Sequence, residues 1–166
     1  MADRPRAPER EAGRHAFGLR PRLREMADRL AGSGYTVLVP NVFHRNGRAP
    51  VAELPEFIDP AADGPVALAA GFHGADLATE APDGPHLVAG RITAELYFGH
   101  ADQDPGLPAE QQERLTAALA GAGVRHRCEV YEGAAHGYTQ ADTAAYGPEA
   151  TERHWAALLD LLERTF

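Results

Sequence analysis

ITAELYFGHADQDPGLP, at residues 92–108, decides the fold of this chain. It begins with mostly apolar residues, as in a strand that is buried on both faces, and it ends in a polar, proline-containing turn. A helix is predicted over residues 108–122, another strand over residues 125–133 and a last helix over residues 148–165. Because strands alternate with helices here, we expect a parallel sheet covered by helices.

The sequence before residue 92 contains further candidate elements. PVALAAGF (65–72) and YTVLVP (35–40) have the apolar, β-branched composition of buried strands. Closer to the N-terminus, an amphipathic helix is predicted to begin at Pro21 and to end at a Gly-Ser-Gly turn. The charged residues 1–14 show no periodicity and are predicted to be a disordered lead-in, which leaves residues 15–166 as a single domain.

Residues 41–65 do not fit this pattern. They contain four prolines and no periodic apolar stretch. A structureless segment of this length is unusual inside a compact domain. We therefore expect that elements of the fold are absent from this part of the chain.

Composition narrows the classes of partner. The formal net charge is −8 and the sequence pI is about 5.4, which argues against nucleic acid or an anionic membrane as the main partner. The single cysteine, Cys128, excludes a disulfide-stapled scaffold. No stretch has the apolar length of a membrane helix or the apolar core of a signal peptide, so the expected location is the cytoplasm.

Asp104 and His136 are the candidate catalytic residues. Each directly follows a predicted strand, so both should lie at the same edge of the sheet, where parallel sheets place reactive residues. A hydrolytic triad needs an acid that orients a histidine base, and in one common chain order the acid precedes the base. Asp102 is a nearby competitor for the acid, and Asp104 is preferred for its spacing to Pro108.

These residues lie in segments that resemble the dienelactone hydrolase family of α/β-hydrolases, which act on esters and lactones. The resemblance implies that Asp104 is the triad acid and His136 the triad base. It also places a backbone N–H of the oxyanion hole near Ala16 or Phe17, and it implies a small ester or lactone substrate without a cofactor. The matching segments are HAFGLRPRLREMADRLAGSGYTVLVPNVFHR (15–45), GFHGADLATEAPDGPH (71–86), YFGHADQDPGLP (97–108) and CEVYEGAAHGYTQADTAAYGPEATERHWAALLDLL (128–162).

The sequence departs from the family pattern at three places. No G-x-C-x-G or G-x-S-x-G elbow precedes residues 65–72, because Pro60 leads almost directly into that strand. RAPEREAGR (6–14) replaces the apolar strand expected before HAFG, and His15 replaces an acidic residue. We therefore expect a partial α/β-hydrolase fold, incomplete at the N-terminal strands and the nucleophile elbow, with impaired activity.

No residue of this chain is a convincing substitute nucleophile. Ser33 is the only serine, and it lies in the glycine turn at the wrong end of the following predicted strand. Cys128 lies in the middle of a predicted buried strand, where a cysteine is usually a small core residue. The identity of the nucleophile is therefore unknown.

Other interpretations stay open at this point. His73 follows a strand and is a candidate for substrate contact or an ordinary loop residue. A metal-dependent hydrolase would use His100, Asp102, Asp104 and His136, although their spacing matches no familiar metal motif. A non-catalytic remnant would bind a small carboxylate or a partner subunit. Missing strands would also leave exposed sheet edges, through which the chain is expected to self-associate.

Overall fold

The structure is a computed structural model that describes residues 20–39 and 66–166. The chain divides into two compact units, Met1–Pro55 and Glu56–Phe166. Among the described helices, none is long and apolar enough to cross a membrane.

In the first unit, the predicted helix is present as α1, Pro21–Gly32. Pro21 occupies its first turn, where the missing N–H costs nothing, and Ser33 and Gly34 end it. The strand predicted at 35–40 is wrong for its described residues, because residues 35–39 form no strand and the Leu38 side chain is 87% exposed. An apolar composition is not sufficient, since a strand also needs a neighbouring backbone to pair with.

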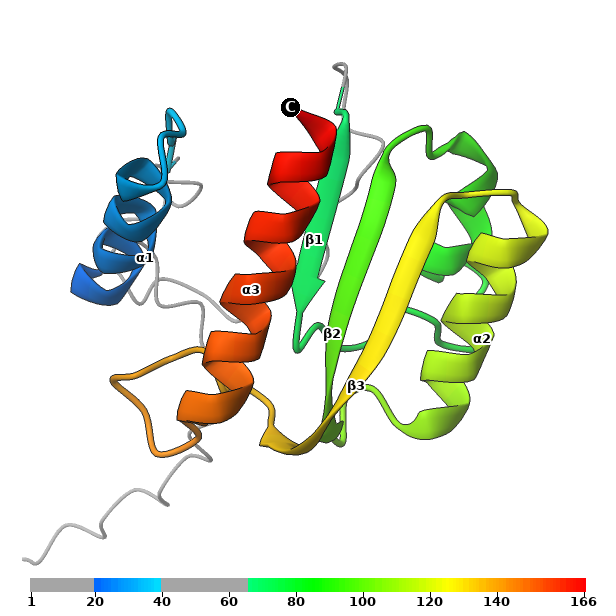
Figure 1. Ribbon diagram of the computed structural model, residues 1–166. Coiled ribbons are helices and arrows are strands. Elements are labelled where there is room, and N and C mark those ends of the chain that lie inside the picture. The colour runs from blue at the N-terminus through cyan, green and yellow to red at the C-terminus, as the bar shows by residue number, and fades with distance from the viewer. Residues whose placement is uncertain (1–19, 40–65) are drawn as a thin grey trace, which may run out of the picture. The chain divides into compact units, whose positions relative to one another are not determined.

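In the second unit, the predicted parallel sheet is confirmed. Three strands, β1 (Leu68–Phe72), β2 (Glu95–Gln103) and β3 (His126–Ala135), lie in the order β1-β2-β3, and both pairs are parallel. Figure 1 shows the three strands side by side, with their connections crossing the faces of the sheet.

Helices cover both faces of this sheet (Figure 1). α2 (Ala109–Gly121) packs on one face together with a 3₁₀ helix, η1 (Pro85–Arg91). α3 (Pro148–Thr165) lies along β1 and β2 on the other face. The core between α2 and the sheet is built from small and aliphatic side chains: Ala78, Ala89, Ala94, Leu96, Leu115, Leu119 and Val124.

The buried side of α3 combines polar and apolar residues. Its buried residues are Thr151, His154, Trp155 and Leu161, whereas Leu158, Leu159 and Leu162 are only partly buried. The His154 ring stacks on Phe72 of β1 with a centroid distance of 3.7 Å. Two polar residues therefore take core positions that apolar periodicity alone does not reveal.

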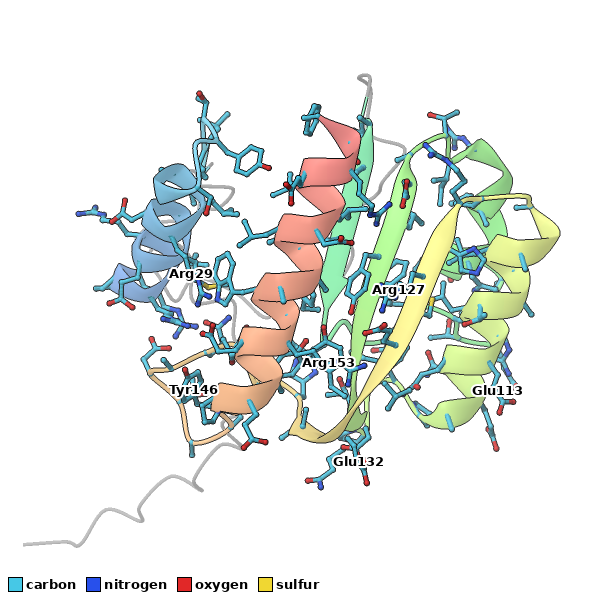
Figure 2. All side chains as sticks on the ribbon, in the orientation of Figure 1. Arg29, Glu113, Arg127, Glu132, Tyr146 and Arg153 are labelled. Atoms are coloured by element: carbon cyan, nitrogen blue, oxygen red, sulfur yellow. The ribbon has the colours of Figure 1, made fainter. Side chains whose placement is uncertain are left out.

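A polar cluster attaches α3 to β2 and β3. Glu129 accepts hydrogen bonds from Tyr97 Oη at 2.8 Å and from Arg153 of α3 at 2.9 Å, and it also pairs with Arg127. The Arg153 guanidinium lies 4.2 Å from the centre of the Tyr131 ring. Figure 2 shows Arg127 and Arg153 on the same side of the sheet. The hydrogen bonds from Tyr97, Arg153 and Arg127 hold the pKa of Glu129 below its usual range, against the effect of burial.

Candidate active site

Asp104 and His136 meet where β2 and β3 end. Asp104 directly follows β2 and His136 directly follows β3. The Oδ2 atom of Asp104 lies 2.7 Å from Nδ1 of His136, and the neutral imidazole donates this hydrogen bond when its proton is on Nδ1. The Asp104 side chain is 2% exposed and the His136 side chain 35% exposed. The carboxylate is thus buried behind an imidazole that solvent can reach.

A tight turn fixes the orientation of the Asp104 carboxylate. Its Oδ1 atom accepts a hydrogen bond from the Gly106 N–H at 2.9 Å, and the Leu107 N–H donates to the Asp104 carbonyl. The Gly106 carbonyl in turn accepts from the N–H of Asp76, at 2.8 Å, in the loop after β1. Both carboxylate oxygens of Asp104 therefore take part in a hydrogen bond, which fixes the orientation of the side chain toward His136.

His73 lies beside His136. Their rings meet edge to face with a centroid distance of 5.1 Å, and Nε2 of His73 lies 2.9 Å from Oγ1 of Thr139. The backbone of His73 has a φ of 46°, which is uncommon for a residue with a Cβ. Burial, reinforced by the nearby His136, lowers the pKa of His73 to about 4. His73 is therefore neutral near pH 7.

The loop after His136 contributes two residues that the sequence analysis missed. Thr139 is 1% exposed and contacts His73, while Tyr138 is fully buried and its hydroxyl donates to the Gly99 carbonyl at 3.3 Å. In the sequence, the signal that could have identified these two residues was their position within three residues of His136. Neither hydroxyl is accessible to solvent, so these residues support the site as buried packing partners.

The proposed metal ligands do not converge. Within residues 20–39 and 66–166, no group of three or more His, Cys, Asp or Glu side chains could hold a metal ion. Asp102 instead accepts a hydrogen bond from the Gly133 N–H at 2.9 Å, and His100 is 2% exposed with its Nε2 atom unbonded in the core. The arrangement thus favours an orienting pair, Asp104 and His136, over a metal cluster.

The two candidate nucleophiles lie in unsuitable surroundings. Ser33 ends α1, and its hydroxyl donates to the Arg29 carbonyl within the same helix. Cys128 lies in the middle of β3, level with Phe98, and burial raises the pKa of its thiol. A raised pKa lowers the thiolate fraction, which is the reactive form. Ala16 and Phe17, the predicted oxyanion donors, lie outside the described residues.

Comparison with known proteins adds evidence that is independent of this geometry. A model of the dienelactone hydrolase family matches residues 57–166. No match was found among curated proteins.

Solved structures share the fold at low sequence identity. A candidate dienelactone hydrolase from Klebsiella pneumoniae subsp. pneumoniae is 18% identical with a TM-score of 0.76, over 93% of this chain and 89% of that one. A protein named m3DLH is 22% identical with a TM-score of 0.70, over 95% and 90% of the two chains. The dienelactone hydrolase-like promiscuous phosphotriesterase P91, from metagenomic libraries, is 18% identical with a TM-score of 0.71, also over 95% and 90%.

The family match covers the whole described part of the second unit, including all three strands, Asp104 and His136. The structural likeness independently supports the α/β fold predicted from the alternation of strands and helices. On these grounds the chain belongs to the dienelactone hydrolase family.

Proposed function

We propose that this chain carries the acid–base half of an ester- or lactone-hydrolysing site. His136 acts as the general base, and Asp104 holds its ring and stabilises the imidazolium that forms. The observation that carries the proposal is the 2.7 Å contact between a buried carboxylate and a solvent-accessible imidazole at the carboxyl edge of a parallel sheet.

The attacking group is water rather than a side chain. The sequence contains no G-x-S-x-G or G-x-C-x-G segment. Its single serine and single cysteine lie away from His136 in sequence, and neither has surroundings that suit nucleophilic attack or proton transfer. His136 takes a proton from water, the resulting hydroxide adds to the ester carbonyl, and the alkoxide leaves with the proton from His136. Without a side-chain nucleophile the reaction does not pass through a covalent intermediate, so turnover is slow.

Hydrolysis of p-nitrophenyl acetate by the full chain tests this proposal. We expect slow, linear release of p-nitrophenol without an initial burst, because no acyl-enzyme forms. His136→Ala should remove the activity and Asp104→Asn should lower it strongly, because an amide no longer favours the Nδ1–H tautomer. Cys128→Ala is the matched control and should leave the rate unchanged.

Three results would contradict the proposal. An initial burst of p-nitrophenol equal to the amount of enzyme would make Cys128 a nucleophile if this burst is absent in Cys128→Ala. A wild-type rate in His136→Ala would remove His136 from the reaction. Activity that is lost only after treatment with a chelator would instead support the metal-dependent alternative.

We further propose that the chain self-associates through β1, which lies at one edge of the sheet formed by the described residues. LAAGF (68–72) carries no charged residue or proline, the features by which exposed edge strands usually resist pairing. Sedimentation velocity should therefore show a sedimentation coefficient that rises with protein concentration, and Ala70→Arg should reduce the rise. A single monomeric species at every concentration would contradict self-association.

The cytoplasmic location stays a prediction, which fractionation of cells that express the chain would check.

A further inference from the structure

β2 and β3 change register directly before the candidate site. Along most of the pair the register is regular, and Ala101 lies level with Tyr131. Two residues further along β2, Gln103 lies level with Ala135, which is four residues further along β3. β3 therefore contains two more residues than β2 over this interval, which is a β-bulge.

The bulge determines which residue of β3 reaches Asp104. If the earlier register continued, Gln103 would lie level with Gly133, and Asp104 would lie level with Ala134. With the bulge, Gln103 is level with Ala135, so the next residues, Asp104 and His136, come level with each other. Their 2.7 Å contact therefore depends on the two additional residues in β3.

One side chain binds the backbone inside the bulge. Oδ2 of Asp102 accepts a hydrogen bond from the N–H of Gly133 at 2.9 Å. Gly133 has a φ of 74°, in the left-handed region that favours glycine. A Cβ at Gly133 would meet no atom within 4 Å, so the requirement for glycine comes from the backbone conformation and not from lack of space.

We propose that Asp102 is a positioning residue, which holds the Gly133 bulge and thereby places His136 beside Asp104. This inference rests on the proposed function, in which Asp104 and His136 are the working pair. It also separates two acids that the sequence offered for one role: Asp104 contacts the imidazole, and Asp102 acts through the backbone of β3. Because Asp102 only accepts a hydrogen bond, an uncharged acceptor can replace it.

Two pairs of variants test the acceptor at Asp102 and the backbone conformation at Gly133. Asp102→Ala removes the acceptor, whereas Asp102→Asn keeps an oxygen acceptor and removes the charge. Gly133→Ala penalises the left-handed backbone, whereas Gly133→Asn tolerates it better. Asp102 and Gly133 are both exposed, so all four variants should fold, which thermal melting checks.

The readout is the tautomer of His136 in the full chain labelled with ¹⁵N-histidine. Spectra are recorded near pH 8, above the ordinary imidazole pKa of about 6.5. His136→Gln assigns the signals, and Asp104→Asn shows which signal depends on the carboxylate. We expect Asp102→Ala and Gly133→Ala to lower the fraction of His136 protonated at Nδ1 at least about threefold, while Asp102→Asn and Gly133→Asn retain the wild-type fraction.

The outcomes separate this inference from the proposed function. An unchanged His136 tautomer in Asp102→Ala and Gly133→Ala would overturn the positioning role alone. An equal loss in Asp102→Asn and Asp102→Ala would show that the charge matters, and would overturn the acceptor role. A wild-type His136 tautomer that does not respond to Asp104→Asn would overturn the proposed pair itself, and the positioning role with it.

Discussion

Gly106 lies where the loop after β1 meets the turn that carries Asp104. A Cβ at this position would lie 2.5 Å from the Cβ of Ala75 and 3.2 Å from Oδ1 of Asp104. In the sequence, Gly106 lies in the proline-containing turn that ends residues 92–108, but a turn alone does not require glycine here. The requirement comes from the approach of Ala75, which belongs to a different loop.

We expect Gly106→Ala to lower the free energy of unfolding by about 1–3 kcal/mol, the usual cost of forcing extra volume into a packed site. Urea unfolding measures the change. Gly90→Ala is the control, because a Cβ at Gly90 meets no atom within 4 Å. If Gly106→Ala and Gly90→Ala are equally stable, the loops that carry Ala75 and Gly106 can move apart without a loss of folding free energy.

His100 is a buried histidine that the proposed mechanism does not use. Its ring stacks on Phe98 with a centroid distance of 5.7 Å, and its Nε2 atom is buried without a hydrogen bond. Burial lowers the pKa of His100 to about 4, although Asp104 opposes the shift. Between about pH 6.5 and about pH 4 the unfolded chain therefore binds a proton at this residue that the folded chain does not bind.

Stability should consequently fall as the pH is lowered through this window. For His100 alone, the loss between about pH 7 and about pH 5 is about 2 kcal/mol. His100→Leu removes the titrating group, so the fall in the free energy of unfolding between these two pH values should be smaller by about that amount. Urea unfolding at both pH values measures it, and an equal fall in wild type and variant would show that His100 binds a proton as readily in the folded chain as in the unfolded chain.

At the scale of elements, the start of α3 is attached to the loop that follows His136. The Tyr138 carbonyl accepts two hydrogen bonds, one from the Gly147 N–H at 3.0 Å and one from the Thr151 hydroxyl at 2.8 Å. Thr151 is 1% exposed, so its hydroxyl is shielded from competing water. The helix thus supports the loop that carries the proposed base.

Replacing Thr151 with valine keeps the shape and removes the hydroxyl. We expect the free energy of unfolding to fall by about 1–2 kcal/mol, because a buried hydrogen bond is lost. Thr165→Val is the matched control, since its hydroxyl bonds only to Leu161 in the same helix. A larger effect at Thr165 than at Thr151 in chemical unfolding would rule out the attachment as a source of stability.

The elements also show why some strands were predictable and one was not. Residues 65–72 and 92–99 were predicted as strands from apolar composition, and both regions contain one, because each finds a parallel neighbour. Residues 35–39 have a similar composition and form no strand. Composition reports the tendency of a segment to pair, whereas pairing itself depends on a second segment.

At the scale of the whole molecule, the family match and the second compact unit coincide. The match covers residues 57–166, and the unit covers Glu56–Phe166. Sheet, covering helices and the Asp104–His136 contact all lie within this unit. A compact unit with its own core on both faces of a sheet can in principle fold alone.

We therefore expect the fragment 56–166 to unfold cooperatively in urea and to retain the His136 tautomer of the full chain. The full chain measured under the same conditions is the control. A fragment without a cooperative transition would instead support the single domain at 15–166 that the sequence analysis predicted.

The class of fold and the two residues of the proposed acid–base pair follow from the sequence, because strand–helix alternation and the positions of Asp104 and His136 directly after strands do not depend on distant contacts. The sequence indicates the family through the resemblance of whole segments, not through this alternation. Tertiary structure alone decided that Asp102 binds Gly133, that Gly106 must be glycine and that His73 rests on Thr139 and His136. These contacts join segments far apart in the chain, and they depend on how β1, β2 and β3 pair with one another, which no local pattern encodes.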